Sequence, residues 1–237
     1  PYALHAWLLG VQIAACNVKV AKKFSKKNVS KLLDLVVHDL SPSSRGVAKV
    51  RKFLADRGIK FVVVPHFKGT HLDGAVFFDA DKTPVVALTG RYDRLDNFWF
   101  TLLHELAHIV LGHVTPDSDV IFDDLDIVPH ETQEAEADRL ARESAIPNER
   151  WREFPLHECS PSDIYDLALD LGISPAIVAG GGRVGNKKKR ALFSLGGAGG
   201  GRKKFLEGFV AWRLVEIEEG DPHKRVVGGH GNYPRDQ

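Results

Sequence analysis

The stretch TLLHELAHIVLGH, residues 101–113, constrains the fold of this chain more than any other part of the sequence. Its periodicity predicts an amphipathic helix whose apolar side covers a core, formed by Trp99, Leu102, Leu106, Ile109 and Val110. His104 and His108 lie one turn apart on the opposite side, within about 40° of each other. The helix must therefore bury one side and present a polar stripe that carries two histidines.

Two histidines at this spacing are also typical of a solvated polar face, so the pair alone does not decide between the two interpretations. Glu105 follows the first histidine directly, in the HExxH pattern that gives a zinc peptidase its general base. The rest of the helix is strongly apolar, which predicts that the stripe faces a cleft. A third ligand is also available downstream.

One route to a third ligand is the extended motif HExxHxxGxxH. It needs glycine at position 111 and histidine at position 114, where this chain has Leu111 and Val114. His113 misses the required position by one residue, and on a continuous helix it would point about 140° away from the ligand stripe. The sequence therefore excludes a third ligand supplied by the extended motif.

The other route is a carboxylate from a second helix, QEAEADRLA. Glu134 and Asp138 are four residues apart and share one face. Glu134 can bind the metal, while Asp138 can accept a hydrogen bond from a ligand imidazole and fix its tautomer. Ala137 permits close approach of the two helices, and Glu131 is the alternative ligand. An acidic helix start also stabilises the helix dipole, so the pattern favours a metal only in combination with HELAH.

Two imidazoles and one carboxylate form the ligand set of a hydrolytic zinc site, with the fourth position left to water. The same set favours Zn²⁺ over manganese. Glu105 would take a proton from the water that attacks a peptide carbonyl. The strand GAVFF, residues 74–78, is the candidate edge strand for aligning a substrate, with a core strand as the alternative. Four side chains are candidates for a second oxyanion donor: Tyr92, His130, His157 and Tyr165.

The pattern of elements predicts an α+β fold, in which a small antiparallel or mixed sheet packs against the zinc-binding helices and a helical extension follows. In chain order we expect a capped helix within 41–58, a buried strand within 59–67, a hairpin within 74–89, a helix at 95–112, an acidic loop at 117–126 and a helix at 132–144.

Four stretches resemble the ImmA/IrrE-like metallopeptidases: GIKFVVVPHF, LDGAVFFD, RYDRLDNFWFTLLHELAHIVLGH and ETQEAEADRLARESAIP. The third is most similar to the subgroup in which this domain follows a helix-turn-helix region, as in HigA-type antitoxin-like regulators. The resemblance implies a zinc peptidase that cleaves a repressor-like protein under stress. It implies His104, His108 and Glu134 as ligands and Glu105 as the base. The chain departs from the family at Ala145, where a large apolar residue is usual, and after Gly180.

We expect four segments: a basic N-terminal helical segment or linker at 1–40, the metallopeptidase domain at 41–158, a helix-turn-helix-like pair at 159–182, and a Gly/Lys-rich tail at 183–237. In the third segment, Ala168, Gly172 and Val178 have the spacing of a helix-turn-helix. The second helix meets glycines after about five residues, which favours packing over groove binding. The alternative function is nevertheless a DNA-binding regulator whose metal fold is sensory or structural.

Composition limits the partners and the compartment. The net charge is +1, two cysteines suit a reducing cytoplasm, and no apolar run approaches the ~18 residues of a membrane span. The apolar opening lacks a basic flank, so we expect no signal peptide; because the chain begins at Pro1 without any methionine, we expect a preceding segment.

Seven cations in the tail predict either non-specific DNA contact or a solvated tail: Lys187, Lys188, Lys189, Arg190, Arg202, Lys203 and Lys204. Six lysines between 19 and 31 allow the same two interpretations.

Overall fold

The structure is a computed structural model that describes residues 2–29, 31–67, 70, 72–91, 94–118, 120–124, 131–154 and 159–184. The seven cations of the tail lie outside the described residues, and so does the contact with nucleic acid predicted for them.

A four-stranded mixed sheet forms the centre of the fold, with the strand order β1-β3-β2-β4. Strands β2 (Leu72–Phe78) and β3 (Pro84–Leu88) form the predicted antiparallel hairpin. Strand β1 (Lys60–Val63) pairs in parallel with β3, and β4 (Ile121–Asp124) pairs in antiparallel with β2. The sheet is therefore mixed, and the predicted α+β class is confirmed.

Two expectations about the sheet are wrong. The stretch at 117–126 is not only an acidic loop, because residues 121–124 form β4. Its aspartates have low strand propensity, but pairing with β2 supplies the backbone hydrogen bonds that propensity alone does not predict. As a consequence GAVFF lies within β2, between β3 and β4, and is an internal strand instead of an edge.

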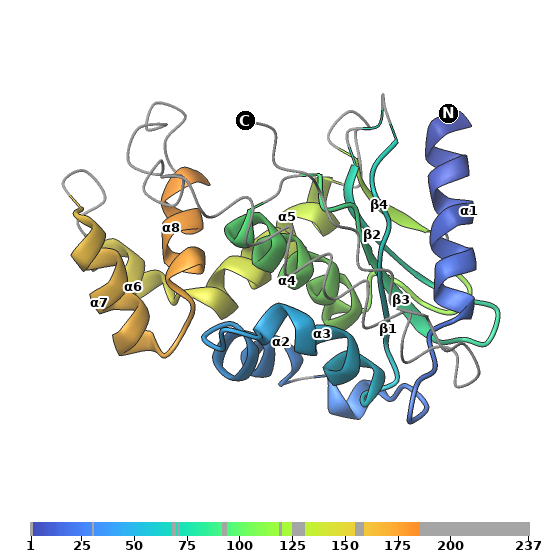
Figure 1. Ribbon diagram of the computed structural model, residues 1–237, viewed down its shortest axis with the longest axis horizontal. Coiled ribbons are helices and arrows are strands. Elements are labelled where there is room, and N and C mark those ends of the chain that lie inside the picture. The colour runs from blue at the N-terminus through green and yellow to red at the C-terminus, as the bar shows by residue number, and fades with distance from the viewer. Residues whose placement is uncertain are drawn as a thin grey trace, which may run out of the picture.

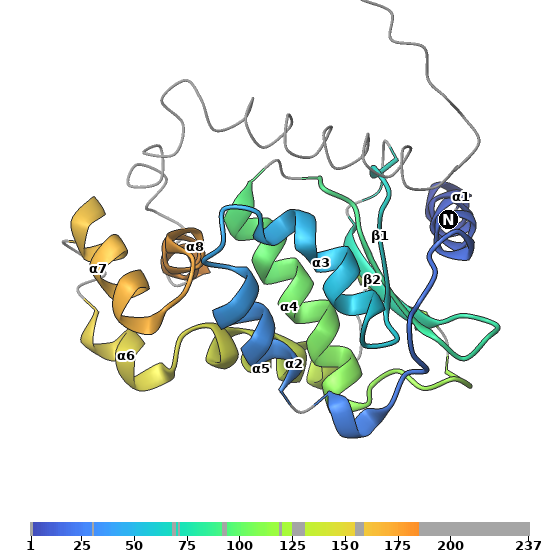
Figure 2. The same cartoon turned by 60° about the horizontal axis from the view of Figure 1, so that its bottom comes forward.

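The sheet lies between helix α1 (Tyr2–Cys16) on one face and helix α4 (Leu95–Leu111) on the other (Figure 1; Figure 2). Helix α5 (Glu131–Ala145) packs against α4. Both α4 and α5 match the predicted helices to within one residue at each end. The remaining helical elements are η1 (Lys26–Asn28), α2 (Leu32–Leu35), η2 (Val36–Leu40), α3 (Gly46–Ala55), α6 (Asn148–Glu153), α7 (Pro161–Leu171) and α8 (Pro175–Val184).

The predicted helix within 41–58 starts later than its sequence suggests. Helix α3 begins at Gly46, and its N-cap residue Arg45 makes no side-chain capping bond, so the expectation of a capped start is wrong. Ser41 instead serves a distant contact: its hydroxyl accepts a hydrogen bond of 2.9 Å from the backbone N–H of Ser174. This bond ties the start of α8 to the end of η2.

Each face of the sheet has its own apolar cluster. On the α4 face, Val76, Val86 and Leu88 pack with residues of α2, α3, α4 and α5. On the other face, Trp7 and Val11 of α1 pack against the strands, and Trp7 Nε1 donates a hydrogen bond of 3.0 Å to the carbonyl of Val64. The N-terminal segment therefore covers one face of the sheet and completes the smaller of the two clusters.

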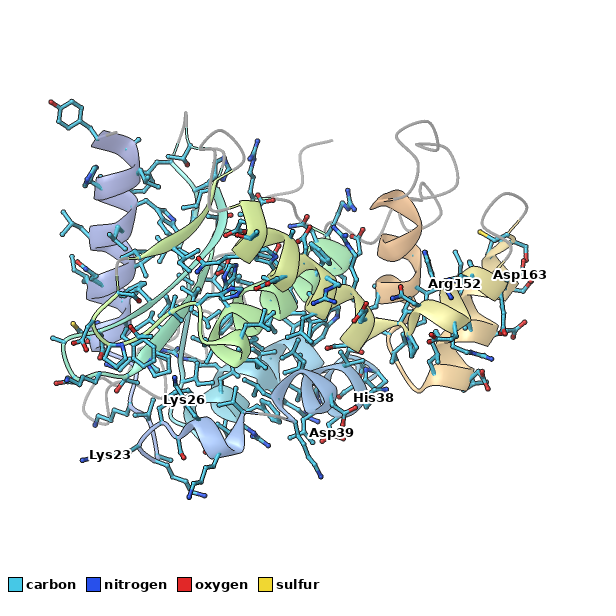
Figure 3. All side chains as sticks on the ribbon, turned by 180° about the vertical axis from the view of Figure 1, so that it is seen from behind. Lys23, Lys26, His38, Asp39, Arg152 and Asp163 are labelled. Atoms are coloured by element: carbon cyan, nitrogen blue, oxygen red, sulfur yellow. The ribbon has the colours of Figure 1, made fainter. Side chains whose placement is uncertain are left out.

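The lysines that follow α1 lie at the surface. Lys19, Lys22, Lys23, Lys26, Lys27 and Lys31 are all exposed, on a loop and the short helix η1. Figure 3 shows Lys23 and Lys26 on this part of the chain, at the end of the molecule opposite Arg152 and Asp163.

Helix α8 is longer than expected, because it continues through the glycines to Val184. A Cβ added at Gly180 would lie 2.8 Å from Asp96 Cβ, and one at Gly181 would lie 3.1 Å from the ring of Trp151. Close packing against neighbouring elements thus outweighs the low helix propensity of glycine. Helices α7 and α8 bend by 117° at their junction, Val178 is buried, and α8 packs on both α4 and α7.

Among the described residues, no single helix combines the length and the apolar composition needed to cross a membrane; the bent pair α7 and α8 meets both criteria only when its two helices are taken together.

Replacement of Trp7 tests whether α1 belongs to the core. Trp7 is fully buried, so Trp7→Ala should lower the free energy of unfolding by about 3–5 kcal/mol in urea denaturation. Ile13 lies on the same helix but is 68% exposed, so the control Ile13→Ala should change the free energy of unfolding by less than about 0.5 kcal/mol. Equal stabilities for the Trp7→Ala variant and the parent would show that α1 does not pack on the sheet.

Candidate metal centre

The candidate centre lies where α4 and α5 meet. Ala137 and Ala141 on α5 are completely buried, and their small side chains let α5 approach α4 closely (Figure 2). His104 and His108 on α4 are also buried, at 4% and 0% exposure. The predicted polar stripe is therefore enclosed, and it faces the second helix instead of open solvent.

Three side chains converge on one point between these helices. His104 Nε2 lies 3.0 Å from Glu134 Oε2 and 3.1 Å from His108 Nε2. His108 Nε2 lies 3.5 Å from Glu134 Oε1. The structure thus brings together the three residues that the sequence predicts as ligands, as a group that could hold a metal ion.

The spacing of these atoms fits Zn²⁺. Metal–ligand bonds of 2.0–2.2 Å in a tetrahedron place neighbouring ligand atoms about 3.3–3.6 Å apart. The observed separations of 3.0, 3.1 and 3.5 Å differ from this range by at most a few tenths of an ångström. Two nitrogens and one carboxylate oxygen are also a donor set that zinc accepts. The residues present therefore fit the metal without rearrangement of the helices.

Asp138 lies behind the first histidine. Its Oδ1 is 2.9 Å from His104 Nδ1, and its Oδ2 is 2.5 Å from Arg142 Nη2. When Nδ1 of His104 donates to this carboxylate, Nε2 keeps the lone pair that a metal requires. Asp138 thus occupies the position that its spacing from Glu134 predicts.

The charges of the cluster also suit a cation. Burial alone would raise the pKa of Glu134, but hydrogen bonds with His104 and His108 outweigh it and lower the pKa to about 2. Burial lowers the pKa of His108. Burial would likewise raise the pKa of Asp138, but the hydrogen bond with His104 and the charge of Arg142 bring its net shift downward. At neutral pH, Glu134 is therefore ionised and His108 is neutral, as metal binding requires.

Glu105 is fully buried against strand β2. A Cβ added at Gly74 would lie 2.2 Å from Glu105 Oε1, so only glycine leaves room for this carboxylate beside the strand. On the helix, Glu105 lies about 100° from His104 and about 60° from His108. Sequence reasoning missed the role of Gly74, although an isolated glycine in a strand often marks such a close approach.

A second unexpected neighbour is His113, whose Nδ1 lies 3.0 Å from His108 Nδ1. Glu136 Oε2 lies 3.1 Å from the Nε2 of the same ring. The expectation that His113 points away from the stripe is wrong, because the helix does not continue to residue 113. Gly112 has a φ of 77° and ends α4, so the angle calculated for a continuous helix does not apply.

The comparison with known families agrees with this centre. The IrrE N-terminal-like domain, a peptidase family, matches residues 57–179. The chain belongs to this family. The match covers α4, α5 and the first half of α8, so it contains all three candidate ligands. A comparison with curated proteins found no match.

The structure describes only some of the other residues predicted for the IrrE N-terminal-like site. Tyr92, His130 and His157 lie outside the described residues. Tyr165 lies on α7 and is 64% exposed, and it belongs to none of the contacts above. Glu131, the alternative ligand, is the first residue of α5, and its side chain lies outside the part of the chain that the structure describes.

A cavity of about 270 Å³ lies between α4, α5, α6 and α8. Its lining includes Phe100, Leu103, Ile146, Trp151, Ile177 and Arg142. Since Arg142 also pairs with Asp138, the wall of the cavity connects directly to the residue that holds His104.

A double-mutant cycle tests the contact between Gly74 and Glu105. In the parent, Gly74→Ala should lower the free energy of unfolding by about 1–3 kcal/mol, because the new methyl overlaps a buried carboxylate. In a Glu105→Ala background the same change should cost less, since the overlapping atoms are gone. Chemical denaturation of the metal-free proteins measures both values. An equal cost in the two backgrounds would contradict the contact.

Replacement of Asp138 tests its support of His104. Asp138→Asn should weaken Zn²⁺ binding about 10 to 100-fold, because the hydrogen bond to His104 Nδ1 loses its charged acceptor. Competition with a chromophoric chelator measures the affinity. The control Glu149→Gln makes the same change of charge at an exposed position on α6 and should bind like the parent. Parent-like affinity in Asp138→Asn would refute the role.

Proposed function

We propose that this chain is a zinc-dependent endopeptidase that hydrolyses a peptide bond in a regulatory protein. The observation that carries the proposal is the cluster of His104, His108 and Glu134, whose ligand atoms lie 3.0 to 3.5 Å apart on neighbouring helices. Glu105 lies between the two histidines on the same helix, and the chain belongs to a peptidase family.

Each residue of the site has a separate role in the proposed hydrolysis. His104, His108 and Glu134 would hold the zinc, which would supply Lewis-acid activation of the attacking water and of the substrate carbonyl. Glu105 accepts the proton from the attacking water and passes it to the leaving amine. Burial of Glu105 keeps bulk water away from its carboxylate, and the close approach of the Gly74 backbone restricts the position of that carboxylate. Asp138 holds His104 in the ligand tautomer.

The proposed substrate is a repressor with a helix-turn-helix region, cleaved in the cytoplasm in stress or toxin–antitoxin regulation. The support is the similarity of the RYDRLDNFWFTLLHELAH stretch to the subgroup linked with HigA-type regulators. Cleavage of a repressor would relieve repression irreversibly, which suits a stress signal.

A second candidate function is a DNA-binding regulator in which the metal fold is sensory or structural. The bend of 117° between α7 and α8 and the spacing of Ala168, Gly172 and Val178 favour it. Against it, Val178 is buried and α8 packs on both α4 and α7, which leaves less of α8 for a DNA groove. A structural metal site also has no use for a base at position 105.

The Glu105→Gln variant separates these two functions. Glutamine is nearly isosteric, so the variant should bind Zn²⁺ as tightly as the parent, but it cannot accept a proton and should lose at least about 100-fold in turnover. Incubation with a proteome-derived peptide library, followed by mass spectrometry of new termini, measures cleavage.

The parent treated with a chelator, and then with added Zn²⁺, controls for contaminating peptidases, because its cleavage should disappear and return. If Glu105→Gln produced the same new termini at the parent rate, Glu105 would not be the base and the proposed mechanism would be wrong.

A further inference from the structure

The second histidine of the centre has an unusual neighbour. After Gly112 ends α4, the backbone N–H of His113 donates a hydrogen bond of 3.0 Å to the carbonyl of His108. This turn brings the two rings together, with centroids 5.1 Å apart and Nδ1 atoms 3.0 Å apart. The His113 side chain is only 8% exposed. The contact is therefore built by the end of the helix and is held inside the protein.

Hydrogen-bond chemistry allows one arrangement of protons when His108 binds a metal through Nε2. His108 Nδ1 must then carry a proton, so it donates to His113 Nδ1. His113 in turn carries its proton on Nε2 and donates to Glu136 Oε2, which lies 3.1 Å away. Donor and acceptor match at every step.

We propose that His113 and Glu136 form a relay that positions His108 for the metal. His113 is the positioning residue that holds the His108 ring and its tautomer, and Glu136 sets the tautomer of His113. His113 is not a ligand, because both of its ring nitrogens are engaged elsewhere, and the carboxylate of the candidate centre is that of Glu134. The proposal rests on the metal centre of the proposed function.

The two ligand histidines are thus supported in different ways from the same helix. Asp138 of α5 contacts His104 directly, whereas Glu136 of α5 reaches His108 through an intervening imidazole. Glu136 is 52% exposed, so solvent screens its charge. Loss of His113 should therefore matter more than loss of the Glu136 charge.

Four variants test the relay by Co²⁺ titration, followed through the visible absorption of the bound ion, and by Zn²⁺ competition. His113→Leu should weaken both affinities about 10-fold or more and alter the Co²⁺ spectrum, because the His108 ring loses its acceptor. His113→Asn should recover most of the affinity, since an amide oxygen can accept from His108 Nδ1.

The other two variants test whether Glu136 acts through His113. Glu136→Gln should weaken binding a few-fold in the parent. The same change in the His113→Leu background should have no further effect, since the connection to His108 is already lost. Thermal unfolding of the metal-free variants controls for folding.

Each outcome bears on the proposal. Parent-like affinity and spectrum in His113→Leu would overturn the relay while leaving the metal centre intact. Equal losses in His113→Leu and His113→Asn would assign His113 a packing role and also overturn it. A parent that binds neither ion would refute the centre and the relay together. If His113→Leu does not fold, His113→Asn with parent-like affinity and Glu136→Gln with a few-fold loss support the relay, and an unchanged Glu136→Gln overturns it.

Discussion

The close packing of α5 on α4 is the contact on which the rest of the site depends. Because Ala137 and Ala141 have small side chains, the acidic face of α5 comes within hydrogen-bond distance of the histidines on α4. The sheet fixes α4 from the other side, and Gly74 of β2 admits the Glu105 carboxylate there. Helix α4 thus obtains the carboxylates that face its histidines from α5, and the space for its candidate base from β2.

This arrangement has an electrostatic cost that a cation would offset. In the tautomers that bind metal, His104 Nε2 and His108 Nε2 are both bare acceptors, and they lie 3.1 Å apart. They cannot hydrogen-bond to each other in that state, and neither can donate to the Glu134 carboxylate beside them. Contacts at the two Nδ1 atoms, with Asp138 and His113, hold the rings in place. The site is therefore preorganised for a positive ion.

Sequence periodicity predicted the parts of the site that depend on regular helices. The spacing of His104 and His108, and that of Glu134 and Asp138, follows from one helical turn, and the structure brings these faces together. The prediction failed where regular geometry ends. Gly112 adopts a left-handed conformation and returns His113 to the site, which a calculation for a continuous helix cannot show. Strand β4 and the extension of α8 depend on tertiary pairing and packing, and the role of Gly74 depends on a contact with another element.

The most direct test of this account is X-ray diffraction from crystals grown with Zn²⁺, with anomalous differences measured at the zinc absorption edge. We predict one anomalous peak bonded to Nε2 of His104, Nε2 of His108 and a carboxylate oxygen of Glu134. The Nδ1 atom of His104 should keep its contact with Asp138, and that of His108 its contact with His113. A peak elsewhere, or a zinc ion bound through an Nδ1 atom of either histidine, would contradict this account.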